Sequence, residues 1–413
     1  MWVSLPVACC WAVLSCVHSC GDKSAQHFCL PHCIFACGVY PYVPDALKKL
    51  DPAILSSKKL RVGKGRAANL AIGLSLLLLA SRLALAQTPG FIDTHGHVVN
   101  GGQSRTDFRG ALDAAIGRMD QFGIRRIIIM PPPMVATVPG AYDIESYNFA
   151  KQAYAGRILL GGGGGSLNGM IQATAPENVT DDIKKAFRLR AEQIVAAGAV
   201  VFGEIALHHL SLSFMGSRHP YEWTPPDHPL LLLLADIAAE KNIVMDLHLD
   251  LVPEDMKLPD RPAFNSTNPA LLKANMAAFE RLLVRNRGAK IVWAHAGTDP
   301  LGTRTPQIQR ELLSRNPNLF MSLRLGGAAP APFIALNSDK KLKPAWLDLL
   351  REFADRFVIG SDFFHSPKGS GSQRGPSDET MENYRSTLAQ MPPELAQVIA
   401  HGNAEKIYRL GEQ

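Results

Sequence analysis

Short apolar runs alternate with longer amphipathic segments along most of this chain. Runs that are apolar throughout are typical of parallel strands buried on both faces. The predicted strands are Phe91–His95, Ile127–Met130, Arg157–Leu160, Val200–Ala206, Ile243–His248, Lys290–His295, Leu319–Leu323 and Phe357–Gly360. Helical spacing of apolar residues predicts helices over Asp181–Ala197, Leu230–Lys241, Pro269–Arg287 and Pro344–Asp355. Eight alternating strands favour a single α/β domain, a (β/α)8 TIM-like barrel, over an open doubly wound sheet.

Two segments between these elements differ from ordinary connections. Gly161–Gly165 follows the third predicted strand but lacks the spacing and the lysine of a phosphate-binding loop, so we interpret it as a flexible loop. Ser211–Asp227 is long and carries Tyr221 and Trp223. We expect it to cover part of a binding pocket; the alternative is a packed surface loop.

The net charge is confined to the beginning of the chain. The first 86 residues hold nine Lys or Arg and three Asp or Glu, which accounts for the whole formal charge of +6. The remaining chain is neutral, so the basic balance gives no reason to expect a nucleic-acid partner. We therefore divide the sequence into a leader, residues 1–86, and one domain, residues 87–413.

The end of the leader has the three parts of a secretory signal peptide. Basic residues from Lys58 to Arg66 precede the apolar run Leu70–Ala80, and Ala84-Leu85-Ala86 has the small residues of a cleavage site. Residues from about 60 to 86 are thus predicted to direct export, to a periplasm or outside the cell. After cleavage the enzyme would have no stable membrane insertion; the alternative is a retained single-helix anchor, although the run is short for a bilayer.

A long stretch precedes this signal. All seven cysteines lie within the first 37 residues, and 57 residues stand before Lys58. Our hypothesis is that translation begins near Leu60 or Val62 on a non-Met codon, which would leave residues 1–59 outside the protein. The alternatives are a Cys-rich prefix that binds membrane or metal, and lipid attachment at Cys16. An intact mass that retained the cysteines would contradict the hypothesis, and a cysteine-free body suits an oxidising compartment.

Metal-competent side chains stand at the carboxyl ends of the predicted strands. His95 and His97 alternate on one strand and therefore project to the same face, which supplies half of a metal site; alone, such a pair could equally be surface or satisfied core histidines. Because the carboxyl ends of barrel strands share one rim, the others should converge with them. The remaining candidates are Glu204, His248, His295 and Asp362.

Three aspartates lie on the same strands as these candidates. Asp246 and Asp250 share the strand face of His248, so we expect them to orient its imidazole. Asp93 faces the same way as His95 but deeper, where a buried carboxylate needs a partner.

These motifs resemble those of the amidohydrolase superfamily, in its amidohydrolase-related branch (amidohydrolase 2). The resemblance extends from Phe91-Ile-Asp-Thr-His-Gly-His97 through Val292-Trp-Ala-His-Ala-Gly297 and Val358-Ile-Gly-Ser-Asp362 to the closing Ile399–Tyr408. The closing segment is similar to the family's terminal Gly-Asn-Ala helix, which is structural there. The resemblance thus covers nearly the whole body and implies the same barrel.

The resemblance also implies a ligand set. His95, His97 and Asp362 would hold one divalent ion and His248 and His295 a second, with Glu204 as the bridge where many relatives have a carboxylated lysine. Without that bridge a single ion would be held by His95, His97, His248 and Asp362, and His295 would serve as an acid or base beside it. Imidazole and carboxylate ligands favour Zn²⁺, with Mn²⁺, Fe²⁺ and Co²⁺ as alternatives.

The implied chemistry is hydrolysis of an amide, ester or lactone carbonyl. A divalent cation lowers the pKa of a bound water from 15.7 to about 7, and Asp362 would take the proton from it as catalytic carboxylate. The alternative enzyme is a metal-dependent non-oxidative decarboxylase, because the branch is also similar to carboxy-lyases. A non-catalytic exported barrel that binds metal or ligand is the third hypothesis.

Further polar residues near the rim are candidates for contacts with a small-molecule substrate. Arg324 could bind a carboxylate through its planar guanidinium, and a structural ion pair is the alternative. His208 and His209 follow Glu204 closely and could contact substrate or only cap the strand. His365, three residues beyond Asp362, could line the pocket.

Overall fold

The computed structural model describes residues 89–98, 107–135, 141–326, 334–369 and 377–411. The predicted signal peptide and the Cys-rich opening lie outside the described residues. Within the described part of the chain, no helix combines the length and the apolar character needed to cross a bilayer.

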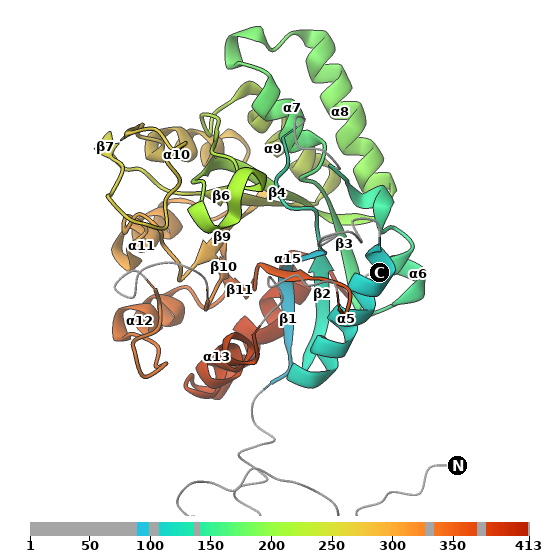
Figure 1. Cartoon of the computed structure of the whole chain (residues 1–413), viewed down its shortest axis with the longest axis vertical. Coiled ribbons are helices and arrows are strands. Elements are labelled where there is room, and N and C mark those ends of the chain that lie inside the picture. The colour runs from blue at the N-terminus through green and yellow to red at the C-terminus, as the bar shows by residue number, and fades with distance from the viewer. Residues whose placement is uncertain (1–88, 99–106, 136–140, 327–333, 370–376, 412–413) are drawn as a thin grey trace, which may run out of the picture. The chain divides into compact units, whose positions relative to one another are not determined.

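Eight parallel strands form a closed ring, as the sequence predicts (Figure 1). Each strand pairs with its neighbours along the chain, and the pairing of Asp93 with Ile359 joins the last strand to the first. The ring strands are β1 (Phe91–Val98), β2 (Ile124–Ile129), β3 (Ile158–Gly163), β4 (Ala199–His209), β6 (Val244–Leu249), β9 (Lys290–Ala296), β10 (Leu319–Leu323) and β11 (Phe357–Ile359). All eight predicted strands are therefore present.

Four shorter strands lie at the margins of the ring. β12 (Phe363–His365) pairs with the end of β1, and β5 (Glu222–Trp223) runs antiparallel to the end of β4. β7 (Met256–Lys257) and β8 (Leu271–Leu272) form a separate hairpin. β5 lies inside the segment that was expected to cover a pocket.

Helices surround the ring (Figure 1). In chain order they are α5 (Phe108–Phe122), α6 (Ala150–Ala153), α7 (Leu167–Ala173), α8 (Asp181–Ala196), α9 (Pro229–Lys241), α10 (Met276–Arg285), α11 (Pro306–Arg315), α12 (Pro344–Glu352), α13 (Asp378–Ala389), α14 (Pro393–Gln397) and α15 (Asn403–Ile407). Their ends follow from local sequence: Thr180 caps α8 through the backbone N–H of Ile183, and Gly123 ends α5 with φ of 72°.

The predicted helix Pro269–Arg287 is wrong in its first part. Leu271 and Leu272 are extended, and the helix begins only at Met276. Asn275 accounts for the late start, because its Oδ1 accepts from the N–H of Val252 at 2.8 Å and its Nδ2 donates to the carbonyl of Asp250 at 3.0 Å. These bonds hold the preceding segment against the loop after β6.

The core has two layers. A large apolar cluster fills the space between strands and helices, and a smaller one lies among inward side chains such as Ile92, Val244 and Val292 together with Ile407 and Tyr408. The C-terminal segment is therefore part of the barrel core. Asn403 fixes it, because its Nδ2 donates at 2.7 Å to the carbonyls of Ala354 and Phe357.

The glycine run is not the flexible loop that we predicted. Gly161, Gly162 and Gly163 continue β3 and are buried. A Cβ on Gly161 would lie 2.7 Å from Met130 Cβ and Val201 Cγ1, and one on Gly162 would lie 2.8 Å from Ile194 Cγ2. Glycine is needed here for close packing between neighbouring strands and helix α8.

Gly164, the next residue, offers a direct test of this packing. A Cβ there would lie 2.4 to 2.9 Å from the carbonyl oxygens of Pro131, Pro132 and Glu204. We expect Gly164→Ala to lower the free energy of unfolding by about 1–3 kcal/mol, the usual cost of overpacking. In Gly117→Ala the new Cβ meets nothing within 4 Å on helix α5, so this control should be stabilised by about 0.5–1 kcal/mol. Equal melting temperatures for the two variants would contradict the packing argument.

Candidate metal centre

The two histidines of β1 point into the carboxyl end of the barrel. Their Nε2 atoms lie 3.1 Å apart, and both residues are fully buried. The glycine between them is required by packing, because a Cβ on Gly96 would lie 2.6 Å from Ile127 Cδ1 on β2. The pair is thus held by strand geometry and by contact with the next strand.

The outer nitrogens of both rings are held by fixed acceptors. His97 Nδ1 lies 2.9 Å from the carbonyl oxygen of Met130, which can only accept, so this nitrogen carries the hydrogen. His95 Nδ1 lies 3.1 Å from Asp246 Oδ1. In the neutral form of each ring, Nε2 therefore has a lone pair that faces its neighbours, which is the arrangement that second partners give to metal-binding histidines.

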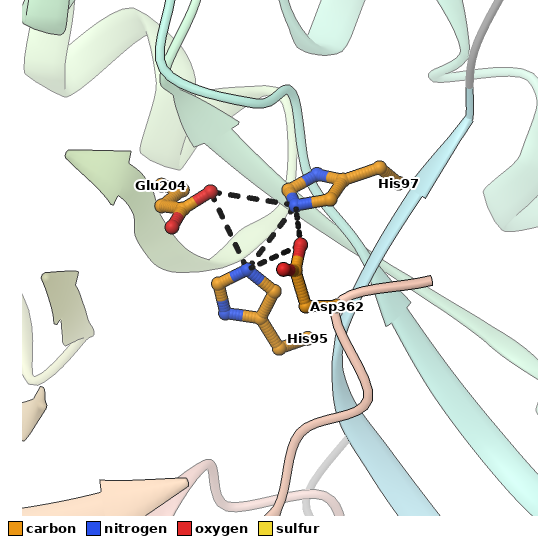
Figure 2. A group of neighbouring side chains, drawn as sticks. All are labelled: His95, His97, Glu204 and Asp362. Carbon is orange, nitrogen blue, oxygen red and sulfur yellow. Dashed lines mark hydrogen bonds and ion pairs between the residues drawn. The ribbon is translucent and has the colours of Figure 1, made fainter. Parts of the chain in front are cut away.

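Glu204, from β4, divides its two carboxylate oxygens between two sets of imidazoles. Oε2 lies 3.5 Å from His95 Nε2 and 3.4 Å from His97 Nε2 (Figure 2). Oε1 lies 2.9 Å from His248 Nδ1 and 3.0 Å from His295 Nε2. One side chain therefore contacts both halves of the cluster.

Asp362 completes the first half. Its Oδ1 lies 3.2 Å from His97 Nε2 (Figure 2). Its Oδ2 forms a 2.8 Å ion pair with Arg324. Burial opposes ionisation, but the guanidinium of Arg324 and the nearby imidazoles hold the pKa of Asp362 well below its ordinary value. Asp362 has a positive φ of 54°, which aspartate tolerates better than most residues, and its N–H donates to the carbonyl of His95 at 2.8 Å.

The donor atoms form two ligand groups that share Glu204. The first ligand group is His95, His97, Glu204 and Asp362, and the second ligand group is Glu204, His248 and His295. Ligands about 2.1 Å from a tetrahedral ion stand about 3.4 Å from one another. In the first ligand group the imidazole and carboxylate atoms are 3.1 to 3.9 Å apart, so these residues fit a divalent cation.

The second ligand group combines histidines with opposite electrostatic surroundings. For His248 burial is outweighed by the carboxylates of Asp250 and Glu204, which raise its pKa to about 9. Burial lowers the pKa of His295 to about 3 despite the nearby Asp362 and Glu204. His295 is therefore neutral at ordinary pH. His248 must lose a proton before its Nδ1 can bind a cation, so acid competes with metal there.

The structure brings together all six residues predicted as ligands, and it revises the environment of the three aspartates. Asp250 lies near His248, with 3.7 Å between its Oδ2 and His248 Nε2. Asp246 faces His95 instead of His248, which corrects our expectation. Asp93 has the partners that its burial requires, since it accepts from the hydroxyl and the N–H of Ser361 and from the N–H of His95.

The four residues predicted as candidates for substrate contact occupy different places. His209 is buried, and its ring lies 4.6 Å from that of His248. Arg324 is a quarter exposed and already paired with Asp362. His208 is fully buried, with Nδ1 2.7 Å from the carbonyl of Asp250, and packs edge-on against Trp223. His365 is buried on β12, next to Phe364, whose ring lies 4.6 Å from that of His97.

Burial of neutral His365 should make the fold sensitive to acid. Burial first, and then the positive charges of Arg118 and His97, lower the pKa of His365 to about 4, whereas an unfolded histidine titrates near 6.5. The unfolded chain therefore binds a proton that the folded chain does not, and stability falls as pH drops below about 6.5.

This contribution can be measured in chelator-treated protein by urea unfolding at pH 7 and pH 5. We expect His365→Gln to reduce the loss of unfolding free energy between these pH values by about 2 kcal/mol relative to the unsubstituted chain. An unchanged loss would show that His365 is already protonated in the folded state.

One acidic residue near the cluster was missed by the sequence analysis. Glu222, on β5, is 2% exposed and accepts a 3.0 Å hydrogen bond from Asn168 on α7. It lies in an irregular segment with no motif or strand periodicity, so nothing in the sequence set it apart from a surface glutamate.

Comparison with known proteins agrees with the residue pattern. The sequence model described as Amidohydrolase (Amidohydro_2) matches residues 92–410, which include all six candidate ligands. The chain belongs to the amidohydrolase family. It is an enzyme of the amidohydrolase type, and its barrel is the one that the family resemblance implied.

Solved structures similar to this amidohydrolase include two of the same description. An amidohydrolase from Mycobacterium avium subsp. paratuberculosis K-10 has 12% identity and a TM-score of 0.37, with 72% of this chain and 74% of that chain covered. Amidohydrolase 2 from Bifidobacterium longum subsp. infantis has 11% identity and a TM-score of 0.39, with 78% and 100% covered. No curated protein matches the sequence.

Proposed function

We propose that the protein is a metal-dependent hydrolase that cleaves an amide, ester or lactone bond of a small molecule, and that it uses two divalent ions. This proposal rests on the position of the Glu204 carboxylate between the two ligand groups. Its Oε2 faces His95 and His97, and its Oε1 faces His248 and His295. A carboxylate placed between two ligand groups is suited to bridge two cations. Zn²⁺ is the favoured metal for such ligands, with Mn²⁺, Fe²⁺ and Co²⁺ as alternatives.

His95, His97 and Asp362 would hold one ion, His248 and His295 the other, and Glu204 both. When bound, such cations lower the pKa of water and polarise a carbonyl group, which is the chemistry that hydrolysis needs. Because the pKa values of His95, His97 and His248 are raised by neighbouring carboxylates against the effect of burial, binding would release protons and weaken below neutral pH.

The protein's own residues supply the proton transfer. Arg324 holds Asp362 Oδ2, which turns Oδ1 toward the first ligand group. An ionised carboxylate in that position can accept a proton from the attacking water and return it to the leaving group. If a single ion is bound, His295 becomes the second candidate for proton transfer, because it is neutral and its Nδ1 lies 4.0 Å from Asp362 Oδ2.

Metal removal provides the test of this function. We expect dialysis against chelator to abolish hydrolysis of a panel of amides, esters and lactones, and Zn²⁺ or Mn²⁺ to restore it. Carbon dioxide release from aromatic and unsaturated acids should be followed in parallel. Metal-dependent release of carbon dioxide without hydrolysis would replace the hydrolase proposal by the decarboxylase, and inactivity in both assays with fully loaded protein would favour the non-catalytic barrel.

A further inference from the structure

A pocket of about 510 Å³ lies between the end of β2, helix α7 and the segment that contains β5. Its lining is mostly apolar and includes Val135, Gly169, Ala173, Tyr221 and Trp223. Glu222 is the acidic residue of this lining. The lining also includes Gln172, whose Nε2 donates to the carbonyl of Ala206 at 2.7 Å. A mostly apolar pocket with a few placed polar groups is the usual form of a site that recognises a small molecule.

Glu222 has one oxygen that the described protein residues do not use. Its Oε2 accepts from Asn168 Nδ2 at 3.0 Å, while its Oε1 is buried without a hydrogen-bond partner among the described residues. A buried carboxyl oxygen left without a partner is costly, so a group that binds there gains from pairing with it.

Asn168 determines which oxygen is free. Its Oδ1 accepts from the N–H of Ala206 at 2.9 Å, and its Nδ2 also donates to the carbonyl of Met134 at 3.2 Å. A backbone N–H and a carbonyl leave the amide only one orientation, so Asn168 always presents a donor to Glu222 Oε2. Oε1 is therefore the atom available to a ligand, and it carries the proton whenever Glu222 is neutral.

The chemistry of Glu222 narrows the group that it would bind. Burial, only partly offset by Asn168, raises the pKa of Glu222 to about 7, so both protonation states are accessible near neutrality. A ligand hydroxyl suits both states, because it donates to a carboxylate and accepts from a carboxylic acid. A ligand carboxylate would be repelled by the ionised form.

The pocket also lies next to the candidate metal centre. Glu222 is the register partner of His209, and Trp223 is the partner of His208. The ring of His209 lies 4.6 Å from that of His248, a member of the second ligand group. A molecule in the pocket would therefore be close to the second ligand group.

We propose that this pocket binds the part of the substrate that does not react, an uncharged group that bears a hydroxyl, and that Glu222 Oε1 recognises the hydroxyl. The mostly apolar lining favours an uncharged group beside that hydroxyl. This inference rests on the proposed function for the reaction itself, but the recognition by Glu222 does not require a metal.

Phenol, anisole and benzoate test the proposal as binding probes. Phenol and anisole share the ring and differ in the hydroxyl hydrogen, and benzoate replaces the hydroxyl by an anion. Binding is measured by ligand-observed NMR on the full chain after chelation, so that no probe can bind to a metal. We expect the dissociation constant of phenol to be about tenfold lower than that of anisole, as one hydrogen bond to a buried oxygen provides, and benzoate to bind more weakly than either.

Substitutions in the pocket test whether Glu222 causes the preference for phenol over anisole. Glu222→Leu should abolish the preference for phenol over anisole, whereas Glu222→Gln, which keeps an amide oxygen and donors, should retain most of it. Glu311→Leu, at an exposed position on α11, is the matched control and should change nothing. Ala173→Trp narrows the pocket without touching the carboxyl, so it should weaken phenol and anisole alike.

Equal affinities of phenol and anisole for the unsubstituted protein would overturn the proposal, and that measurement depends on no variant's folding. An unchanged preference for phenol over anisole in folded Glu222→Leu would also overturn the proposal. If the protein hydrolyses no substrate but still prefers phenol to anisole, the proposed reaction is wrong and the pocket assignment stands. If it hydrolyses a substrate but binds phenol and anisole equally, only the pocket assignment is wrong.

Discussion

Glu204→Gln is expected to lower the metal content from two ions per chain to one at most, and to reduce the rate of hydrolysis by at least about a hundredfold. An amide presents one oxygen and an NH2 group, so it cannot offer an acceptor to both ligand groups at once. Loss of a cation removes the activated water and the polarisation of the carbonyl, and the polarisation alone lowers the activation barrier by several kcal/mol. Metal analysis of purified variant together with the steady-state rate provides the measurement.

The control for this substitution is Glu311→Gln, the same chemical change at an exposed position on α11. It should bind the same amount of metal as the unsubstituted protein and hydrolyse substrate at the same rate. Full activity in Glu204→Gln would contradict the bridging role, and full metal content with lost activity would make Glu204 a catalytic group instead of a bridge.

Asp362→Asn is expected to reduce kcat by about 10²–10⁴, the range that a positioned general base contributes. The neutral amide also loses the charge that pairs with Arg324 and can no longer accept the proton of the attacking water. Because asparagine keeps one oxygen near His97, we expect the fall in metal content to be smaller than in Glu204→Gln. Single-turnover rates at saturating Zn²⁺ separate the catalytic loss from the loss of metal.

Asp348→Asn, on the exposed side of α12, is the matched control and should retain the full rate. Recovery of the Asp362→Asn rate at high Zn²⁺ would show that the carboxylate acts as a ligand alone. In that case His295, a neutral imidazole beside the ionised Asp362, would become the candidate for proton transfer in the single-ion alternative.

The barrel and its ligand set could be predicted because the necessary information is local. Each strand is a short apolar run, and closure of eight parallel strands places their carboxyl ends together. Glu204, His248 and Asp362 are far apart in sequence, yet each is placed by its own strand end. No knowledge of side-chain contacts was needed to expect them to meet.

The errors have a common cause, which is contact between segments far apart in the chain. The Gly161–Gly165 run was interpreted as flexible because the neighbouring Val201 and Ile194 that exclude a Cβ are far away in sequence. Asp246 was assigned to the histidine of its own strand, but its carboxylate faces His95 across the barrel. Glu222 was overlooked because its burial depends on packing of its loop against α7.

The late start of α10 has the same origin. Its sequence has helical spacing from Pro269 onward. The side chain of Asn275, however, forms hydrogen bonds with the backbone of Asp250 and Val252 in the loop after β6. Side chain to backbone hydrogen bonds of this kind compete with helix formation and are set by tertiary structure.

The pairing of β1 with β11 and β12 determines when the first ligand group can be assembled. His95 and His97 are synthesised early, but Asp362, Ser361 and the C-terminal segment that packs among the inward side chains come from the last part of the chain. A nascent chain that still lacks these residues holds two imidazoles without the carboxylate opposite them. The first ligand group is therefore complete only after Asp362 has been synthesised, and a chain truncated before β11 would lack the strand that closes the barrel.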